Sequence, residues 1–127
     1  MGRQLKHIGC SNMKDLQQAN TLTDIDKSLL EELKRTILQH VPDAALFLYG
    51  STARGTRLPD SDYDVLILLN APISTQEEEV IQDAVYELEL SRSVIISLTF
   101  LTHEQWNMPL MTANPFRWNV EKDAIQL

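Results

Sequence analysis

Two short apolar runs on either side of a polar segment constrain the fold of this chain more than any other feature. Residues 44–49 end directly at Gly50, and residues 63–69 are apolar and rich in branched side chains. Runs of this length predict β-strands, and a strand that is apolar at successive positions is covered on both faces. Residues 50–61 hold two glycines, one proline and small polar residues, which predicts a loop with room for one helical turn.

Helices are predicted on either side of the two strands. Residues 23–40 repeat apolar side chains at the spacing of one helix face, with Thr23 placed to cap the start and Pro42 to end the helix. A second helix is predicted to begin after Ser74, where Glu77 stands at the capping-box spacing. The predicted core stripes are Ile25, Leu29, Leu33 and Ile37 in the first helix and Val80, Ile81, Ala84, Val85 and Leu88 in the second.

A third strand is predicted over residues 94–101, whose even positions are all apolar. Thr102, with Gln105 three residues later, then opens a short helix. Trp106 and Trp118 are interpreted as core or interface anchors. The order of helix, strand, turn, strand, helix and strand predicts an α+β or α/β architecture, in which helices cover a small mixed sheet.

Length and polarity set the expected domain organisation. The chain of 127 residues has the size of one domain. Residues 1–22 are polar and show no sustained period, which predicts a loosely ordered leader; a segment that docks on a partner is the alternative. The folded domain is therefore predicted to span residues 23–127.

Charge and cysteine content narrow the class of protein. The formal net charge is −7, so a global basic field that would hold nucleic acid is absent, while a local basic patch stays open. Cys10 is the only cysteine, which excludes an internal disulfide and fits a reducing compartment. The sequence shows neither the apolar region of a signal peptide nor an apolar run of membrane-spanning length. A soluble, cytoplasmic protein is expected.

The junction after the first predicted strand suits an anionic ligand. Gly50 has no Cβ, so the backbone can turn sharply and approach a ligand closely, and the Ser51 hydroxyl can donate to a phosphate oxygen. If residues 52–54 begin a helical turn, their free N–H groups point to the same place. Strand-to-Gly-Ser turns also occur for geometric reasons alone, so this junction by itself is weak evidence for a site.

Two aspartates precede the second predicted strand. Asp62 and Asp64 are two positions apart, so both carboxylates lie on one face, with their Cα atoms roughly 6 to 7 Å apart. Such a pair repels unless a cation compensates it, and Mg²⁺ prefers oxygen ligands of this kind. A solvated loop edge is the alternative. Arg54 and Arg57 stand between the glycine turn and the carboxylates, where phosphate contact and simple solvation are both open.

Together these segments resemble a known family. Residues 50–55 (Gly-Ser-Thr-Ala-Arg-Gly) and residues 60–65 (Asp-Ser-Asp-Tyr-Asp-Val) resemble, in sequence and spacing, the signature of the minimal nucleotidyltransferases of the DNA polymerase beta superfamily. The resemblance implies an α+β nucleotidyltransferase fold, a small mixed β-sheet flanked by helices. The predicted helix before the signature and the helix and strand after it fit that fold.

The resemblance also implies roles for residues. Gly50 and Ser51 would bind the nucleotide triphosphate, Asp62 and Asp64 would be catalytic and hold Mg²⁺, and Arg54 would steady the motif or a phosphate. The reaction would transfer a nucleotidyl group, most often adenylyl from ATP, to a hydroxyl. Many minimal members are antitoxins that adenylylate a helical HEPN-type RNase toxin, so a partner of that type is an expectation from the family.

One departure from the family pattern bears on activity. Active members carry a third carboxylate on a later strand, and the matching face of residues 94–101 offers Ile95, Ser97, Thr99 and Leu101, with no acid. Loss of that carboxylate should impair chemistry more than nucleotide binding. The alternative function is therefore a catalytically weak or inactive module that binds a nucleotide or masks a partner.

Two other functions rank lower. A nucleotidyltransferase that acts on small molecules would need a second domain or a homo-oligomer to form the acceptor pocket, and the sequence shows no evident second domain. Nucleic-acid polymerisation is least favoured, because the chain has neither a basic stretch nor segments for gripping a duplex.

Overall fold

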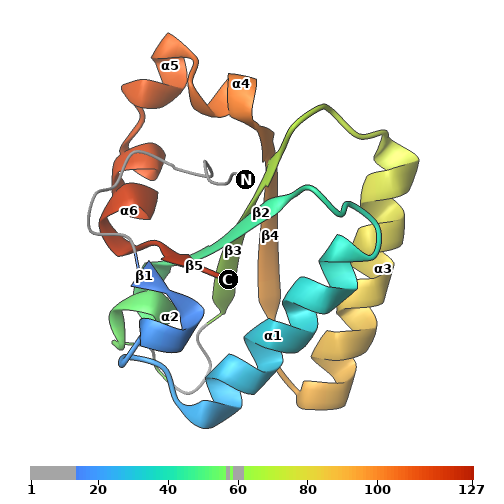
Figure 1. Cartoon of the computed structure of the whole chain (residues 1–127), viewed down its shortest axis with the longest axis vertical. Helices are drawn as coiled ribbons and strands as arrows, with labels where there is room; N and C mark the ends of the chain where they lie inside the picture. The colour runs from blue at the N-terminus through green and yellow to red at the C-terminus, as the bar shows by residue number, and fades with distance from the viewer. Residues whose placement is uncertain (1–13, 57, 59–61) are drawn as a thin grey trace.

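A five-stranded mixed sheet forms the centre of the computed structural model, which describes residues 14–56, 58 and 62–127. The strands follow the spatial order β1-β5-β2-β3-β4 (Figure 1). β2 is antiparallel to β3 and to β5, whereas β3 is parallel to β4 and β1 is parallel to β5. The bounds are β1 (Lys14–Asp15), β2 (Ala45–Tyr49), β3 (Tyr63–Leu69), β4 (Ile96–Thr102) and β5 (Ile125–Gln126).

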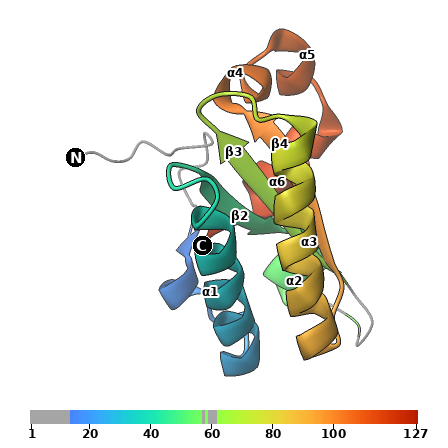
Figure 2. The same ribbon diagram turned by 90° about the vertical axis from the view of Figure 1, so that its right-hand side faces the viewer.

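Helices cover both faces of the sheet. The long helices α1 and α3 lie side by side on one face, and α6 lies behind the sheet on the other, together with α4 (Figure 2). The short helix α2 connects β2 to the segment before β3. The bounds are η1 (Leu16–Gln18), α1 (Asp24–Leu38), α2 (Gly50–Arg54), α3 (Thr75–Arg92), α4 (His103–Trp106), α5 (Pro109–Thr112) and α6 (Pro115–Asp123). The predicted α+β fold, a small mixed sheet flanked by helices, is confirmed.

Capping boxes fix where three helices begin. Ser74 and Glu77 form the predicted box at the start of α3, and Thr102 and Gln105 form the predicted box at the start of α4. Thr23 caps α1 as predicted, and the reciprocal partner of its box is Asp26. Each box satisfies backbone N–H groups that would otherwise have no partner at the helix start.

In both long helices the later residues of the predicted core stripe are buried or partly buried, whereas the first apolar residue of each stripe is exposed. Ile25 is 74% exposed and Val80 is 51% exposed. In the first turn of α1 the buried position is Asp26, one residue further along, which accepts a 2.6 Å hydrogen bond from the Tyr63 hydroxyl. The face of α3 that meets the sheet follows the buried residues Ile81, Val85 and Leu88, and Val80 lies beside this line rather than on it.

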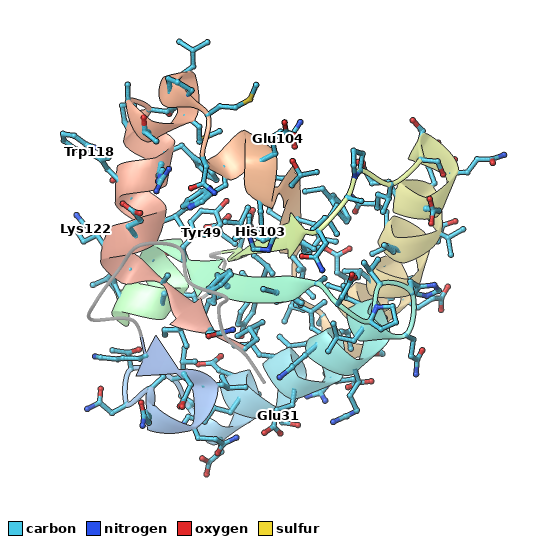
Figure 3. All side chains as sticks on the ribbon, turned by 45° about the horizontal axis from the view of Figure 1, so that its top comes forward. Glu31, Tyr49, His103, Glu104, Trp118 and Lys122 are labelled. Carbon is cyan, nitrogen blue, oxygen red and sulfur yellow. The ribbon has the colours of Figure 1, made fainter. Side chains whose placement is uncertain are left out.

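The two tryptophans have opposite environments. Trp106 is 1% exposed and packs among the residues of β2, β3 and α6. Trp118 is 69% exposed and points away from α6 (Figure 3). Trp106 is therefore a core anchor as predicted, whereas Trp118 lies outside the core and its role as an interface anchor stays a prediction. The third strand is also displaced, because β4 covers Ile96–Thr102 rather than residues 94–101.

The segment predicted as a leader contributes to the described core. Lys14–Asp15 forms β1 and pairs with β5, and the apolar side chains of Leu16, Ala19 and Leu22 are buried. Residues 1–13 lie outside the described part of the chain. No helix among the described residues has the length and apolar character needed to cross a membrane.

Candidate active site

The turn between β2 and α2 brings the backbone against a carboxylate. Gly50 has a φ of +82°, a left-handed conformation that other residues adopt only with strain. A Cβ added at Gly50 would lie 2.6 Å from Oδ2 of Asp64. Glycine is therefore required at this position for two reasons, since both the backbone conformation and the space beside Asp64 exclude a side chain.

A buried threonine ties α2 to the first of the two aspartates. Thr52 is 1% exposed, and its hydroxyl donates a 2.9 Å hydrogen bond to the carbonyl oxygen of Asp62. The helix ends at Gly55, whose φ of +81° allows its N–H group to return to carbonyls of α2. The start of α2 and the approach to β3 are thus held together, a role for Thr52 that the sequence analysis missed.

Asp62 and Asp64 lie where the sequence places them, at the start of the second long strand. Asp64 is in β3, and the register sets it opposite Tyr49 of β2 and Ser97 of β4. Asp62 precedes β3 by one residue, so strand alternation turns both side chains toward the face covered by α6. Burial raises the pKa of the Asp64 carboxyl, and the nearby charge of Asp62 raises this pKa further.

Ser97 meets the pair of aspartates from the neighbouring strand, β4. It is in register with Asp64, and its hydroxyl donates a 3.2 Å hydrogen bond to Oδ2 of Asp62. Within residues 14–56, 58 and 62–127, no three His, Cys, Asp or Glu side chains gather where they could hold one metal ion. The sequence offers no acid on this face of β4. In the structure the Ser97 hydroxyl contacts the Asp62 carboxylate from this face.

Tyr49 closes the side of the site next to α6. Its side chain is hydrogen-bonded to that of Thr99 in β4, and its ring packs edge-on against Phe116 of α6, with the ring centroids 5.5 Å apart. Burial raises the pKa of the Tyr49 hydroxyl, and the carboxylate of Asp64 raises this pKa further. Tyr49 was not predicted as a site residue, although its place directly before Gly50 in an apolar run was a usable signal.

Arg54 forms an ion pair with a residue of α6. One guanidinium nitrogen lies 2.6 Å from Oδ2 of Asp123, whose side chain is 4% exposed, while the Arg54 side chain is 45% exposed. This pair joins α2 to α6, and the role of Arg54 in steadying the motif or a phosphate stays a prediction. Arg57, Asp60 and Ser61 lie outside the described residues.

Comparison with known protein families identifies the family to which this chain belongs. The family model of the nucleotidyltransferase domain matches residues 30–125. The chain belongs to this family. The match extends over β2, α2, β3 and β4, and hence over every residue of the candidate site. No curated protein matches the chain.

The donor atoms of this nucleotidyltransferase suit the divalent metal that domains of its family generally use. Two carboxylates lie on one face, and burial, followed by the nearby charge of Asp62, raises the pKa of the Asp64 carboxyl. A divalent cation relieves such repulsion, and carboxylate and hydroxyl oxygens are the ligands that hard cations prefer. Asp62 and Asp64 are the residues that would hold the ion, and the Ser97 hydroxyl is a neutral oxygen within hydrogen-bond distance of the Asp62 carboxylate.

Proposed function

We propose that this nucleotidyltransferase binds Mg²⁺-ATP and transfers an adenylyl group to a hydroxyl acceptor. The observation that carries the proposal is the contact between the two halves of the signature, in which the Gly50 backbone lies against the Asp64 carboxylate. A phosphate bound at Ser51 would therefore lie beside the two carboxylates. A metal held by Asp62 and Asp64 would supply positive charge that stabilises the α-phosphate as the adenylyl group is transferred.

The chain's own residues account for binding and orientation. The Ser51 hydroxyl, one residue after the turn, donates to the triphosphate, and Thr52 keeps Asp62 in place through the bond to its carbonyl. In the reaction the acceptor oxygen bonds to the α-phosphorus, the bond from this phosphorus to the bridging oxygen breaks, and pyrophosphate leaves. The acceptor's proton passes to solvent, because no third carboxylate stands beside the pair in the described site.

The test is nucleotide binding followed by calorimetry, with and without Mg²⁺. We expect Mg²⁺-dependent binding of ATP by the native chain, and binding at least about tenfold weaker in Asp62→Asn/Asp64→Asn, since the metal's ligands are lost. Asp83→Asn/Glu87→Gln removes the same charge from the exposed side of α3 and should leave binding unchanged. Equal affinity of the native chain and the Asp62/Asp64 variant would overturn the assignment of the site.

A second function is favoured by Ser97. Its neutral hydroxyl stands where a third carboxylate would help to activate the acceptor, so a nucleotide-binding module with weak or no transfer activity is the alternative. Ser97→Asp separates the two functions, with Ser97→Asn as the uncharged control. If the native chain binds nucleotide but transfers nothing, and Ser97→Asp transfers label from ATP, the binding module is correct. Asp64-dependent transfer by the native chain would exclude it.

We further propose a HEPN-type toxin as the acceptor, on the resemblance to minimal nucleotidyltransferases that act as antitoxins. The experiment is co-expression of this chain with a HEPN-type RNase toxin. The expected result is a mass increase of one AMP on that protein, which disappears in Asp62→Asn/Asp64→Asn. An unmodified partner beside an active control acceptor would contradict this choice of substrate.

A further inference from the structure

A hollow outside the candidate active site is lined by basic side chains from three parts of the chain. It has a volume of about 420 Å³ and lies between β1, the end of α2 and the end of α6. Lys14, Arg54 and Lys122 line it, although 40 and 68 positions separate them along the sequence. In Figure 3, Lys122 lies on the lower part of α6, above α2. Neither Asp62 nor Asp64 lines this hollow.

The charge of the hollow opposes that of the molecule. Three basic side chains face one acid, Asp123, so the lining carries an excess of two positive charges. Asp123 is almost fully covered and already bound to Arg54. The whole chain has a net charge of −7, and the hollow on the other side of β1, with Asp15, Glu31 and Lys34, has an excess of one negative charge. An anion is therefore attracted to the first hollow against the overall field.

The wall of this hollow is held in place by bonds that do not involve a ligand. The Thr21 hydroxyl donates a 2.8 Å hydrogen bond to the carbonyl oxygen of Ala53, and the Arg54–Asp123 ion pair fixes α2 to α6. At Gly55 an added Cβ would lie 3.1 Å from the Cβ of Thr21, so the chain packs closely there. A preformed wall lowers the entropy lost when a ligand binds.

We propose that this hollow is a second binding site, for a small polyphosphate anion such as pyrophosphate. Apart from Asp123, its polar lining is basic or hydroxyl-bearing, and its remaining members are Ala53, Ala124 and Ile125. No aromatic side chain lines it among the residues that the structure describes, and these residues offer a nucleobase no ring to stack on. Lysine and arginine bind phosphate oxygens through charged hydrogen bonds, and three basic groups suit a ligand with several negative charges. The hollow shares Arg54 with the candidate active site but lacks both Asp62 and Asp64, and the proposal does not depend on the proposed nucleotidyl transfer.

The experiment is titration of the full chain with pyrophosphate in the presence of EDTA, which removes divalent metal from Asp62 and Asp64. We expect binding by the native chain and a loss of affinity of about tenfold or more in Lys14→Gln/Lys122→Gln, because charged hydrogen bonds are removed. Lys27→Gln/Lys34→Gln is the matched control, since it removes the same charge from α1, and should change affinity by less than about twofold.

Three results would overturn the proposal of a second binding site. No binding by the native chain would exclude the site, and equal losses in the two lysine variants would show a diffuse effect of net charge. Asp62→Asn/Asp64→Asn should still bind pyrophosphate with native or higher affinity in EDTA. Loss of binding there would place the anion in the candidate active site instead. The proposed nucleotidyl transfer fails on a different result, namely Mg²⁺-dependent ATP binding that survives this same substitution.

Discussion

At the scale of single residues, the candidate site depends on two glycines with the same backbone and different neighbours. Gly50 and Gly55 have φ values of +82° and +81°. A Cβ at Gly50 would meet the Asp64 carboxylate, whereas a Cβ at Gly55 would meet Thr21. The two positions therefore separate the cost of backbone strain from the effect on the carboxylate.

Substitution of either glycine by alanine should destabilise the fold by about 1 to 2 kcal/mol, the cost of placing an ordinary residue in the left-handed region. Chemical denaturation measures this loss. Gly50→Ala should also abolish Mg²⁺-dependent ATP binding, because Asp64 must move, while Gly55→Ala should keep it. The role of Gly50 would be contradicted by equal nucleotide binding in the two variants.

The raised pKa of Asp64 predicts how pH changes stability in the absence of metal. A carboxyl with a higher pKa in the folded chain binds more protons when folded than when unfolded, so stability falls as the pH rises through the interval between the two values. Asp64→Asn removes this loss. In EDTA, the melting temperature of the variant minus that of the native chain should therefore be larger at pH 7 than at pH 3.

The control for this measurement is Asp83→Asn on the exposed side of α3. The melting temperature of this variant minus that of the native chain should be about the same at pH 7 and at pH 3. A native chain that becomes more stable relative to Asp64→Asn as the pH rises would show that a partner favours the ionised form. The like-charge pair would then be the wrong description of the site.

At the scale of elements, the strands were predictable because their apolar runs are local. The runs that became β2 and β3 are bounded by glycine, aspartate and proline, and helix starts are marked by capping pairs such as Ser74 and Glu77. What the sequence could not supply was the arrangement of elements around the site. Neither the register of Ser97 against Asp64 nor the pairing of Arg54 with Asp123, 69 positions away, follows from local pattern.

The burial errors have the same origin. Ile25 fits the helical spacing of α1, but the helix is rotated so that Asp26 faces the core and meets Tyr63 of β3. A polar pair that satisfies itself across two elements can displace an apolar residue from a buried position, because a buried carboxyl with a hydrogen-bond partner avoids most of its desolvation cost. Periodicity within one helix contains no information about that partner.

The link between α2 and β3 gives a prediction at this scale. Thr52→Val keeps the shape of the side chain and removes the bond to the Asp62 carbonyl, so we expect a loss of about 0.5 to 1.5 kcal/mol in stability and weaker Mg²⁺-ATP binding. Thr36→Val is the control, since Thr36 donates a similar bond to Glu32 within α1. Both variants should lose stability, and only Thr52→Val should lose affinity. Unchanged ATP binding in Thr52→Val would remove Thr52 from the site.

At the scale of the whole molecule, the candidate site is made from elements of one continuous fold. β2, α2, β3 and β4 each supply part of it, and the packing of Phe116 on Tyr49 brings in α6. The two hydrophobic clusters on either side of the sheet share these strands. A ligand that binds at their junction binds the folded chain and not the unfolded one, so its binding free energy should appear as global stability.

This coupling gives a prediction that needs no acceptor. At an ATP concentration of 100 times the dissociation constant, with Mg²⁺ present, the chain should gain about 2.7 kcal/mol, or a rise of roughly 10 °C in melting temperature for a domain of this size. Asp62→Asn/Asp64→Asn should show no rise under the same conditions, and neither should the native chain in EDTA. A rise in the variant equal to that of the native chain would mean that the nucleotide stabilises the fold from a place other than the two carboxylates. The same scans with Lys14→Gln/Lys122→Gln should show the full rise, because the basic hollow is a separate site that Mg²⁺-ATP binding at the carboxylates does not require.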